Sequence, residues 1–264
     1  MCSLQLRAIQ KSASMIVKKE SLKKHFSKAS RTYDDNASVQ LYMGKKLLEY
    51  IAEDKFRHVL EIGCGSGIFT SEILNRYSPD SVSLNDISEE MLNTCRERFS
   101  DYKNISYHLG DIEKITLKGS YDLVASNACL QWLSDLKGAL NGFIEALDSN
   151  GVLAFTSFGN ENVREITSLT NNGLKYLSYS EIDEVIKSLD EPYSLHEEVI
   201  QFHYKDALDM LKTLKKTGVT GFSKKIWTRG MLNRFIEEYE SRYSDEKGVY
   251  LTWHLYYAVI RKKD

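Results

Sequence analysis

A glycine-rich stretch holds the densest group of residues that could do chemistry. The segment VLEIGCGSGIFT (59–70) places Glu61 ahead of Gly63, Gly65 and Gly67. Glycines let a ligand lie against the main chain, because no Cβ stands in the way. Glu61 could order this loop, or bind an ammonium group of the ligand directly or through water. The spacing G-x-G-x-G differs from the G-x-G-x-x-G of dinucleotide-binding proteins, whose third glycine supports helix packing near a pyrophosphate. It therefore favours a cofactor without a pyrophosphate.

Two aspartates follow Glu61 at even intervals of 25 residues, Asp86 and Asp111. Each ends a predicted strand, and ligands of open α/β sheets bind at the carboxyl ends of the strands. Asp86 can accept both hydroxyls of a ribose, with Ile87 beside it as a further cofactor contact. Asp111 can accept the exocyclic amine of adenine while Ile112 packs against the ring. Each aspartate alone is equally explained as a helix cap or a solvated loop residue, but the set together favours an adenosyl ligand.

The elements that must position these residues alternate between strands and helices. This cadence predicts right-handed βαβ units and a parallel sheet. The run SNACLQW (126–132) ends the fourth strand at the same edge, which places Asn127 and Ala128 beside the cofactor. The predicted strands are 58–63, 81–86, 105–111, 121–127 and 151–158, and the predicted helices between them are 68–77, 88–99 and 136–147.

The remaining segments predict a second set of elements. An amphipathic helix is expected at 35–52, and two β-rich runs at 195–204 and 249–262 are expected to be the terminal strands of the same sheet. We expect residues 1–26 to be an N-terminal extension and 27–264 to form the domain, with cap helices drawn from 27–53 and 162–242. Within the latter range, helical patterns lie near 162–176, 180–189, 205–217 and 228–242.

Composition narrows the class of protein. The 264 residues are 42% hydrophobic, enough for a sizeable core, and the net charge of −2 gives no support for a general affinity for nucleic acid. No apolar run reaches the ~18 residues that a membrane span needs. The four cysteines and six histidines are scattered, so we expect reduced thiols, no metal site and a cytoplasmic protein. Lys, Ser and Arg dominate the first 20 residues, as in a mitochondrial presequence, although an extension with Met15 as the true start is simpler.

Over residues 30–160 these features together resemble the class I S-adenosylmethionine-dependent methyltransferases. The resemblance implies an α/β fold with a Rossmann-like, seven-stranded, mostly parallel sheet of order 3-2-1-4-5-7-6. Its last-but-one strand in space would be antiparallel, with helices on both faces and a small helical cap. It also implies S-adenosylmethionine as the cofactor, S-adenosylhomocysteine as the product, and a sulfonium beside Asn127 and Ala128.

Four segments narrow the resemblance to the malonyl-acyl carrier protein O-methyltransferases of biotin synthesis. The AxxYDxxAxxQ-like opening and the N-x-x-L-Q-W run are the more specific parts. The chain departs from that family in its long N-terminal extension and in NDIS (85–88), where many relatives carry an aspartate flanked by apolar residues. The four segments are FSKASRTYDDNASVQ (26–40), NACLQWLSDLKGAL (127–140), GVLAFTSFGNENVREI (151–166) and LTWHLYYAVIRK (251–262).

This resemblance implies methylation of the free carboxylate of malonyl-acyl carrier protein or malonyl-CoA. A carboxylate with a pKa of about 4 is already a nucleophile near pH 7, so the site must mainly align the reacting atoms and exclude water. Arg164 could hold the carboxylate by a two-pronged hydrogen bond, or be a surface arginine at a helix start. Tyr33 could gate or hydrogen-bond the acceptor, or be a core aromatic, and Gln131 and Trp132 could shape the acceptor pocket.

A basic stretch suggests where a carrier protein would dock. Residues 212–234 contain no acidic residue, and acyl carrier proteins are acidic. A solvated helix face is the plainer explanation of the same charges. The docking residues that we predict are Lys215, Lys216, Lys224, Lys225 and Arg229.

Three other functions remain open at this point. One is a methyltransferase that acts on a free small carboxylic acid or a quinone-type molecule, which would not need the basic face. Another is a nicotinamide-dependent oxidoreductase, against which the glycine spacing and Asp111 both argue. The third is a non-catalytic adaptor that binds the cofactor without turnover.

Overall fold

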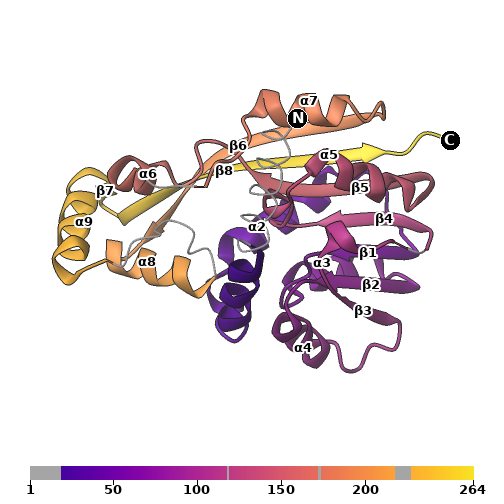
Figure 1. Ribbon diagram of the computed structural model, residues 1–264, viewed down its shortest axis with the longest axis horizontal. Helices are drawn as coiled ribbons and strands as arrows, with labels where there is room; N and C mark the ends of the chain where they lie inside the picture. Colours follow the sequence, from indigo (N-terminus) through magenta and orange to yellow (C-terminus); the bar gives the residue numbers. More distant parts are fainter. Residues whose placement is uncertain (1–18, 118, 172–173, 218–226) are drawn as a thin grey trace, which may run out of the picture.

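The computed structural model describes residues 19–117, 119–171, 174–217 and 227–264. One sheet runs through the molecule with helices on both faces, and a lobe projects from one side of it (Figure 1). The strand order is β3-β2-β1-β4-β5-β8-β6, with the two-residue strand β7 paired to β8. Once β7 is set aside, this is the order 3-2-1-4-5-7-6 predicted from the sequence. That prediction is confirmed.

The first five strands form the parallel part of the sheet, where each pairs in parallel with its neighbour. All of their carboxyl ends therefore face one edge. Their bounds are β1 His58–Ile62, β2 Ser81–Asp86, β3 Ile105–Leu109, β4 Tyr121–Ser126 and β5 Leu147–Phe158.

The long strands β6 (Tyr193–Tyr204) and β8 (Gly248–Arg261) complete the sheet. β8 is antiparallel to β5 on one side and to β6 on the other, and its pairing with β6 runs from Tyr193↔Ile260 to Tyr204↔Val249. The expectation that 195–204 and 249–262 belong to the same sheet is confirmed. β7 (Ser244–Asp245) forms a tight hairpin with the start of β8.

Alternating side chains of the strands build a core on each face. Val59 of β1 packs with the helices of one face, whereas Leu60 and Ile62 pack with those of the other. This two-residue period is what a strand buried on both faces requires. Helices α2 (Ser38–Tyr50), α3 (Ile68–Tyr77) and α4 (Glu89–Arg98) cover the first face, and α5 (Leu136–Glu145) and α7 (Tyr179–Lys187) cover the second.

The projecting lobe gathers at the outer ends of β6 and β8 (Figure 1). It contains α6 (Arg164–Thr170), α8 (Ala207–Lys216) and α9 (Arg229–Arg242). Although α7 also lies within 162–242, it packs on α5 and the sheet and not in this lobe. In the described residues, three short 3-10 helices connect the larger elements: η1 (Asp34–Asn36), η2 (Ile112–Lys114) and η3 (Leu130–Trp132). Residues 19–29 form a further helix.

Candidate active site

A cavity lies at the carboxyl ends of β1, β2, β3 and β4. It encloses about 720 Å³ of space between protein atoms, part of it open to solvent, which suits a small-molecule ligand. The cavity lies at the sheet edge where the sequence predicts that a ligand binds. The predicted site residues that line it are Tyr33, Gly63, Gly65, Asp86, Ile87, Asp111, Ile112, Asn127, Ala128 and Trp132.

Asp86 joins the glycine loop to the start of α4. Its Oδ2 accepts a hydrogen bond from the Gly65 N–H at 2.9 Å, and its Oδ1 accepts one from the Ser88 N–H at 2.8 Å. The residue is only 8% exposed, and this burial raises the pKa of its carboxyl while the backbone N–H groups act in the opposite sense. Each carboxylate oxygen has a second acceptor position, so Asp86 can hold the loop and still bind ligand hydroxyls.

The three glycines all have left-handed backbone conformations, with φ of 68° at Gly63, 55° at Gly65 and 87° at Gly67. A Cβ at Gly67 would come within 2.5 Å of the Phe99 ring, and one at Gly63 would collide with the Cys129 side chain. A Cβ at Gly65 would meet no protein atom within 4 Å. Gly65 is therefore the position where a ligand can approach bare backbone, whereas Gly67 permits close packing against α4.

Glu61 lies beneath the glycine loop and not among the residues that line the cavity. It is 1% exposed, and its Oε2 accepts a hydrogen bond from the Thr70 hydroxyl at 2.6 Å. Burial raises the pKa of its carboxyl to about 8, although the hydrogen bond from Thr70 acts to lower this pKa. Of the two roles predicted for Glu61, these contacts favour the ordering of the loop and of α3.

The pKa of Glu61 gives a prediction for stability against pH. The carboxyl ionises near 4.5 when unperturbed and near 8 in the folded protein, so between these values the folded state holds the extra proton. The free energy of unfolding should then fall as pH rises, by up to about 1.4 kcal/mol per pH unit from this group. Glu61→Gln removes this contribution, so its melting temperature should decline less between pH 5.5 and 8.5. Exposed Glu97 supplies the control Glu97→Gln, and equal declines in both variants would contradict the prediction.

Asp111 lines the cavity but already has a cationic partner. The Lys19 ammonium lies 2.7 and 2.8 Å from its two carboxylate oxygens and also contacts the Glu113 carboxylate. The Asp111 Oδ1 in addition accepts the Glu113 N–H at 3.2 Å, as the cap of η2. A ligand amine would therefore share this carboxylate with Lys19 or displace it.

The helix at 19–29 is a wall of the cavity that sequence reasoning missed. It supplies Lys19, Leu22 and Phe26 to the lining, and the Phe26 ring meets Trp132 edge to face at 6.2 Å. Ser27 ties the helix to the start of α4 through the hydroxyl of Ser88 at 2.9 Å. Residues 19–26 lie in the segment that the sequence assigns to an N-terminal extension, and in the structure they belong to this cavity wall. The helical spacing of Leu22, Phe26 and buried Ala29 was the signal that could have found this helix.

Tyr33 also contributes to the lining, as predicted. Its burial raises the pKa of the hydroxyl well above its usual value, and the negative charge of Asp86 adds to this effect. The hydroxyl therefore stays protonated at neutral pH and can donate a hydrogen bond. Its role in gating or binding an acceptor remains a prediction.

A second cavity of about 610 Å³ adjoins the first, and the two share Lys19, Leu22, Trp132 and Leu133. Gln131, predicted to shape an acceptor pocket, lines this second cavity and donates to the Ala128 carbonyl at 2.7 Å. Trp132 lies between the two spaces. The second cavity therefore offers room for another reactant next to the first.

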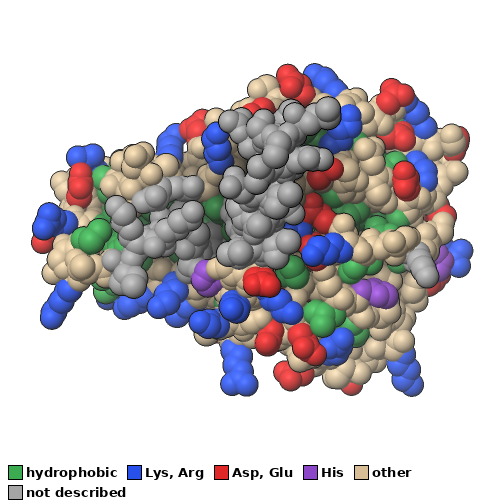
Figure 2. Space-filling view, viewed as in Figure 1, with side chains coloured by type: hydrophobic (Ala, Val, Ile, Leu, Met, Phe, Trp, Pro, Cys, Tyr) green, Lys and Arg blue, Asp and Glu red, His purple; other side chains and the backbone are tan. Residues whose placement is uncertain are grey.

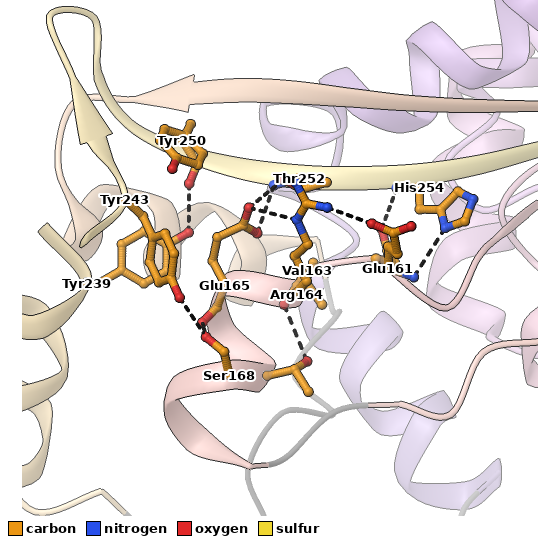
Figure 3. Close-up of polar contacts among 12 residues, drawn as sticks. Glu161, Val163, Arg164, Glu165, Ser168, Tyr239, Tyr243, Tyr250, Thr252 and His254 are labelled. Atoms are coloured by element: carbon orange, nitrogen blue, oxygen red, sulfur yellow. Dashed lines mark hydrogen bonds and ion pairs between the residues drawn. The ribbon is translucent and has the colours of Figure 1, made fainter. Parts of the chain in front are cut away.

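Arg164 lines neither cavity, and lies instead beside Glu161 and Glu165 (Figure 3). Val163 has a left-handed φ of 53° and donates its N–H to the Thr252 carbonyl at 2.8 Å, which turns α6 toward β8 and the lobe. The Arg164 side chain is 52% exposed and donates to the Glu161 carboxylate at 2.6 Å, and it lines neither cavity. Its Nε lies 3.7 Å from buried Glu165, which accepts the Thr252 N–H. The catalytic role that we predicted for Arg164 does not fit this placement.

The structure describes residues 212–217 and 227–234 of the basic stretch 212–234. Lys215 and Lys216 are exposed in the last turn of α8, and Arg229 is exposed at the start of α9. Figure 2 shows Lys and Arg side chains gathered in the region that α8 occupies in Figure 1. Lys224 and Lys225 lie outside the described residues. The end of α8 contacts the segment around η1, since the Thr32 hydroxyl donates to the Lys216 carbonyl at 3.3 Å.

Metal ligands and membrane spans were also sought in the described parts of the chain. These parts contain no group of three or more His, Cys, Asp or Glu side chains that could hold a metal ion. None of their helices combines the length and apolar character needed to cross a bilayer. Cys64, Cys95 and Cys129 are free thiols.

Comparison with known proteins decides the family. A family described as "Methyltransferase domain" matches residues 59–151. The malonyl-[acyl-carrier protein] O-methyltransferase 2 of Ilyobacter polytropus is 31% identical over 94% of this chain and 99% of its own length. The chain belongs to the malonyl-acyl carrier protein O-methyltransferase family.

Other members of this family are similar to the chain at comparable levels of identity. The Calditerrivibrio nitroreducens enzyme is 32% identical over 91% of this chain and 96% of its own length. The Bacteroides fragilis enzyme is 35% identical over 90% of this chain, which spans about half (49%) of that relative.

Solved structures support the fold alone. The YcgJ protein from Bacillus subtilis superposes with a TM-score of 0.60 at 16% identity, covering 85% of this chain and 98% of its own. The N-methyltransferase NodS from Bradyrhizobium japonicum gives 0.51 at 15% identity, covering 84% and 86%.

Membership of the malonyl-acyl carrier protein O-methyltransferase family confirms the predicted enzyme class and its cofactor, S-adenosylmethionine. The residues present fit that cofactor. A buried carboxylate at Asp86 stands beside bare backbone at Gly65, and Ile87 and Ile112 offer apolar surface for a base. The individual contacts of these residues with the cofactor remain predictions.

Proposed function

We propose that the protein methylates the free carboxylate of a malonyl group carried as a thioester on an acyl carrier protein, in biotin synthesis. The observation that carries this proposal is the pair of adjoining cavities that share Trp132, one of them built from the glycine loop, Asp86 and Asp111. S-adenosylmethionine supplies a methyl group on a positively charged sulfur and leaves as neutral S-adenosylhomocysteine. A carboxylate oxygen of the acceptor forms the new bond to that methyl carbon, which gives a methyl ester.

In this scheme the residues of the chain bind the cofactor and the acceptor and align their reacting atoms. Asp86 and Gly65 hold the cofactor at the strand ends, and the helix at 19–29 covers it and excludes water through Leu22 and Phe26. No strong general base is needed, because the acceptor is ionised near neutral pH. The acceptor occupies the second cavity, where Gln131 and Trp132 form one wall.

The deciding experiment supplies labelled S-adenosylmethionine together with malonyl-acyl carrier protein, and follows the carrier by intact mass. The expected result is a gain of one methyl group that alkaline treatment removes, as an ester requires. Malonyl-CoA, free malonate and a quinone-type acceptor run in parallel separate the competing acceptors. Transfer to the free acid or the quinone alone would replace the carrier-protein proposal. Cofactor binding without turnover on any of them would favour an adaptor.

A carrier-protein substrate requires a basic docking face, for which Lys215 and Lys216 are the described candidates. The double variant Lys215→Glu/Lys216→Glu should raise KM for malonyl-acyl carrier protein roughly tenfold, because it opposes an acidic partner. Its KM for malonyl-CoA should change little. The control is Lys55→Glu/Lys103→Glu, two exposed lysines that precede β1 and β3 at the opposite edge of the sheet. Equal effects on both substrates would remove the docking face from the proposal.

The proposal places the enzyme in the cytoplasm, with no nucleic acid and no membrane as partner. Fractionation of cells that produce the tagged protein tests this location. Recovery with membranes or with nucleic acid would contradict it.

A further inference from the structure

The turn that follows β4 is held in an unusual backbone conformation. Asn127, Ala128 and Cys129 line the cofactor cavity, and Ala128 has a φ of 50°, a left-handed conformation that residues with a side chain seldom adopt. Such conformations persist only where the surroundings impose them, and they concentrate at functional sites. A neighbouring group must therefore hold the left-handed conformation of Ala128.

A single hydroxyl binds both Asn127 and Ala128 of the turn. Thr156 of β5 is 0% exposed, and its Oγ1 accepts the Ala128 N–H at 2.8 Å. The same Oγ1 donates its proton to Oδ1 of Asn127 at 2.7 Å. The Asn127 amide then donates to the Gln40 carbonyl of α2 at 2.8 Å. The hydroxyl acts as acceptor and donor at once, which no aliphatic side chain can do.

The sheet register places this hydroxyl opposite the turn. β4 and β5 are parallel, and Ser126 pairs with Phe155, so the next residue of β5 stands beside the first residue of the turn. The turn also packs on the glycine loop, because a Cβ at Gly63 would collide with Cys129. A shift of the turn would therefore be transmitted to Gly63 at the floor of the cavity.

We infer that Thr156 is a positioning residue of the methyl-transfer site, which locks Asn127 and Ala128 in the conformation that binds the cofactor. It does not line the cavity and acts only through the turn. Without the hydroxyl, the Ala128 N–H and the side-chain Oδ1 of Asn127 lose their partner, and the left-handed turn loses the group that holds it. The part of the cavity wall that Asn127 and Ala128 form would then vary in position.

The test compares two variants at this position with a matched one elsewhere. Thr156→Val keeps the shape and removes the hydroxyl, and Thr156→Ser keeps the hydroxyl. Thr252→Val is the control, because Thr252 is also buried in the sheet and its hydroxyl binds Glu165 in the lobe, away from the cavity. Titration calorimetry measures the dissociation constant of S-adenosylhomocysteine for each protein, and thermal melting reports their stability.

Thr156→Val is expected to raise the dissociation constant roughly tenfold and to speed hydrogen exchange at the Ala128 amide. Thr156→Ser should restore both to within about threefold. Thr252→Val should lower the melting temperature and leave the dissociation constant unchanged. Binding by Thr156→Val within twofold of the unaltered protein, or equal weakening in Thr252→Val, would overturn the inference. These measurements need no methyl acceptor, so they stand apart from the test of the malonyl substrate.

Discussion

Replacing Asp86 with asparagine is expected to raise the dissociation constant of S-adenosylmethionine on the order of 100-fold, since hydrogen bonds to a charged group contribute about 1.5–3 kcal/mol each. The amide of asparagine also turns an N–H group toward the Gly65 or Ser88 N–H, both of which now donate to the carboxylate. The glycine loop and the start of α4 would lose a shared acceptor. Calorimetric titration at pH 7.5 measures the change.

The control for this variant is Asp101→Asn, at an exposed aspartate of the loop before β3. It alters the net charge by the same amount and should leave the dissociation constant within about twofold. If Asp86→Asn weakens binding less than threefold, Asp86 does not hold the cofactor. A circular dichroism spectrum of each variant establishes that the fold is retained.

The second large effect is expected on stability, from Gly67→Ala. The alanine would have to adopt the left-handed backbone conformation at φ 87°, and its Cβ would come within 2.5 Å of the Phe99 ring. Backbone strain of about 1–2 kcal/mol and overpacking of about 1–3 kcal/mol together lower the free energy of unfolding by roughly 3 kcal/mol. For a domain of this size, that corresponds to a fall in melting temperature of about 6–12 °C.

Gly65→Ala is the matched variant. It imposes the same left-handed backbone strain on an alanine, but its Cβ meets no protein atom within 4 Å. Its melting temperature should fall less, while its affinity for the cofactor should fall more than that of Gly67→Ala, since Gly65 lines the cavity and Gly67 does not. Differential scanning calorimetry and ligand titration on both proteins separate the two effects. Equal losses of stability in the two variants would contradict the packing role of Gly67.

The parallel half of the fold could be predicted because its signals are local. The first four predicted strands are short runs that end in a glycine or polar residue, and the carboxyl ends of parallel strands must share one edge. Strand ends alone therefore suffice to bring Asp86 and Asp111 to a single cavity, which both residues line. The partner strands 195–204 and 249–262 were likewise found from their β-rich composition.

Other parts depended on contacts that no local pattern specifies. Arg164 follows β5 in sequence, as a residue of the site would. Several hydrogen bonds to β8 divert the chain into the lobe, among them those from the Val163 N–H to the Thr252 carbonyl and from the Thr252 N–H to the Glu165 carboxylate. Lys19 falls in the predicted extension, yet it binds Asp111, which is 92 residues away. In both cases the deciding partner is distant in sequence, so the residue types alone could not indicate it.

The position of β8 has a consequence for how the chain is made. β8 lies between β5 and β6, although the ribosome synthesises it after both. Residues 58–158 can assemble during translation, because β1 to β5 find all of their partner strands except β8 within this segment. Until residues 248–261 emerge, β5 and β6 carry unpaired edges that invite association with other chains. Translation that stops before Gly248 thus yields a polypeptide with the parallel strands β1 to β5 but with β5 and β6 lacking their common partner, and such unpaired strands make it a substrate for chaperones and proteases.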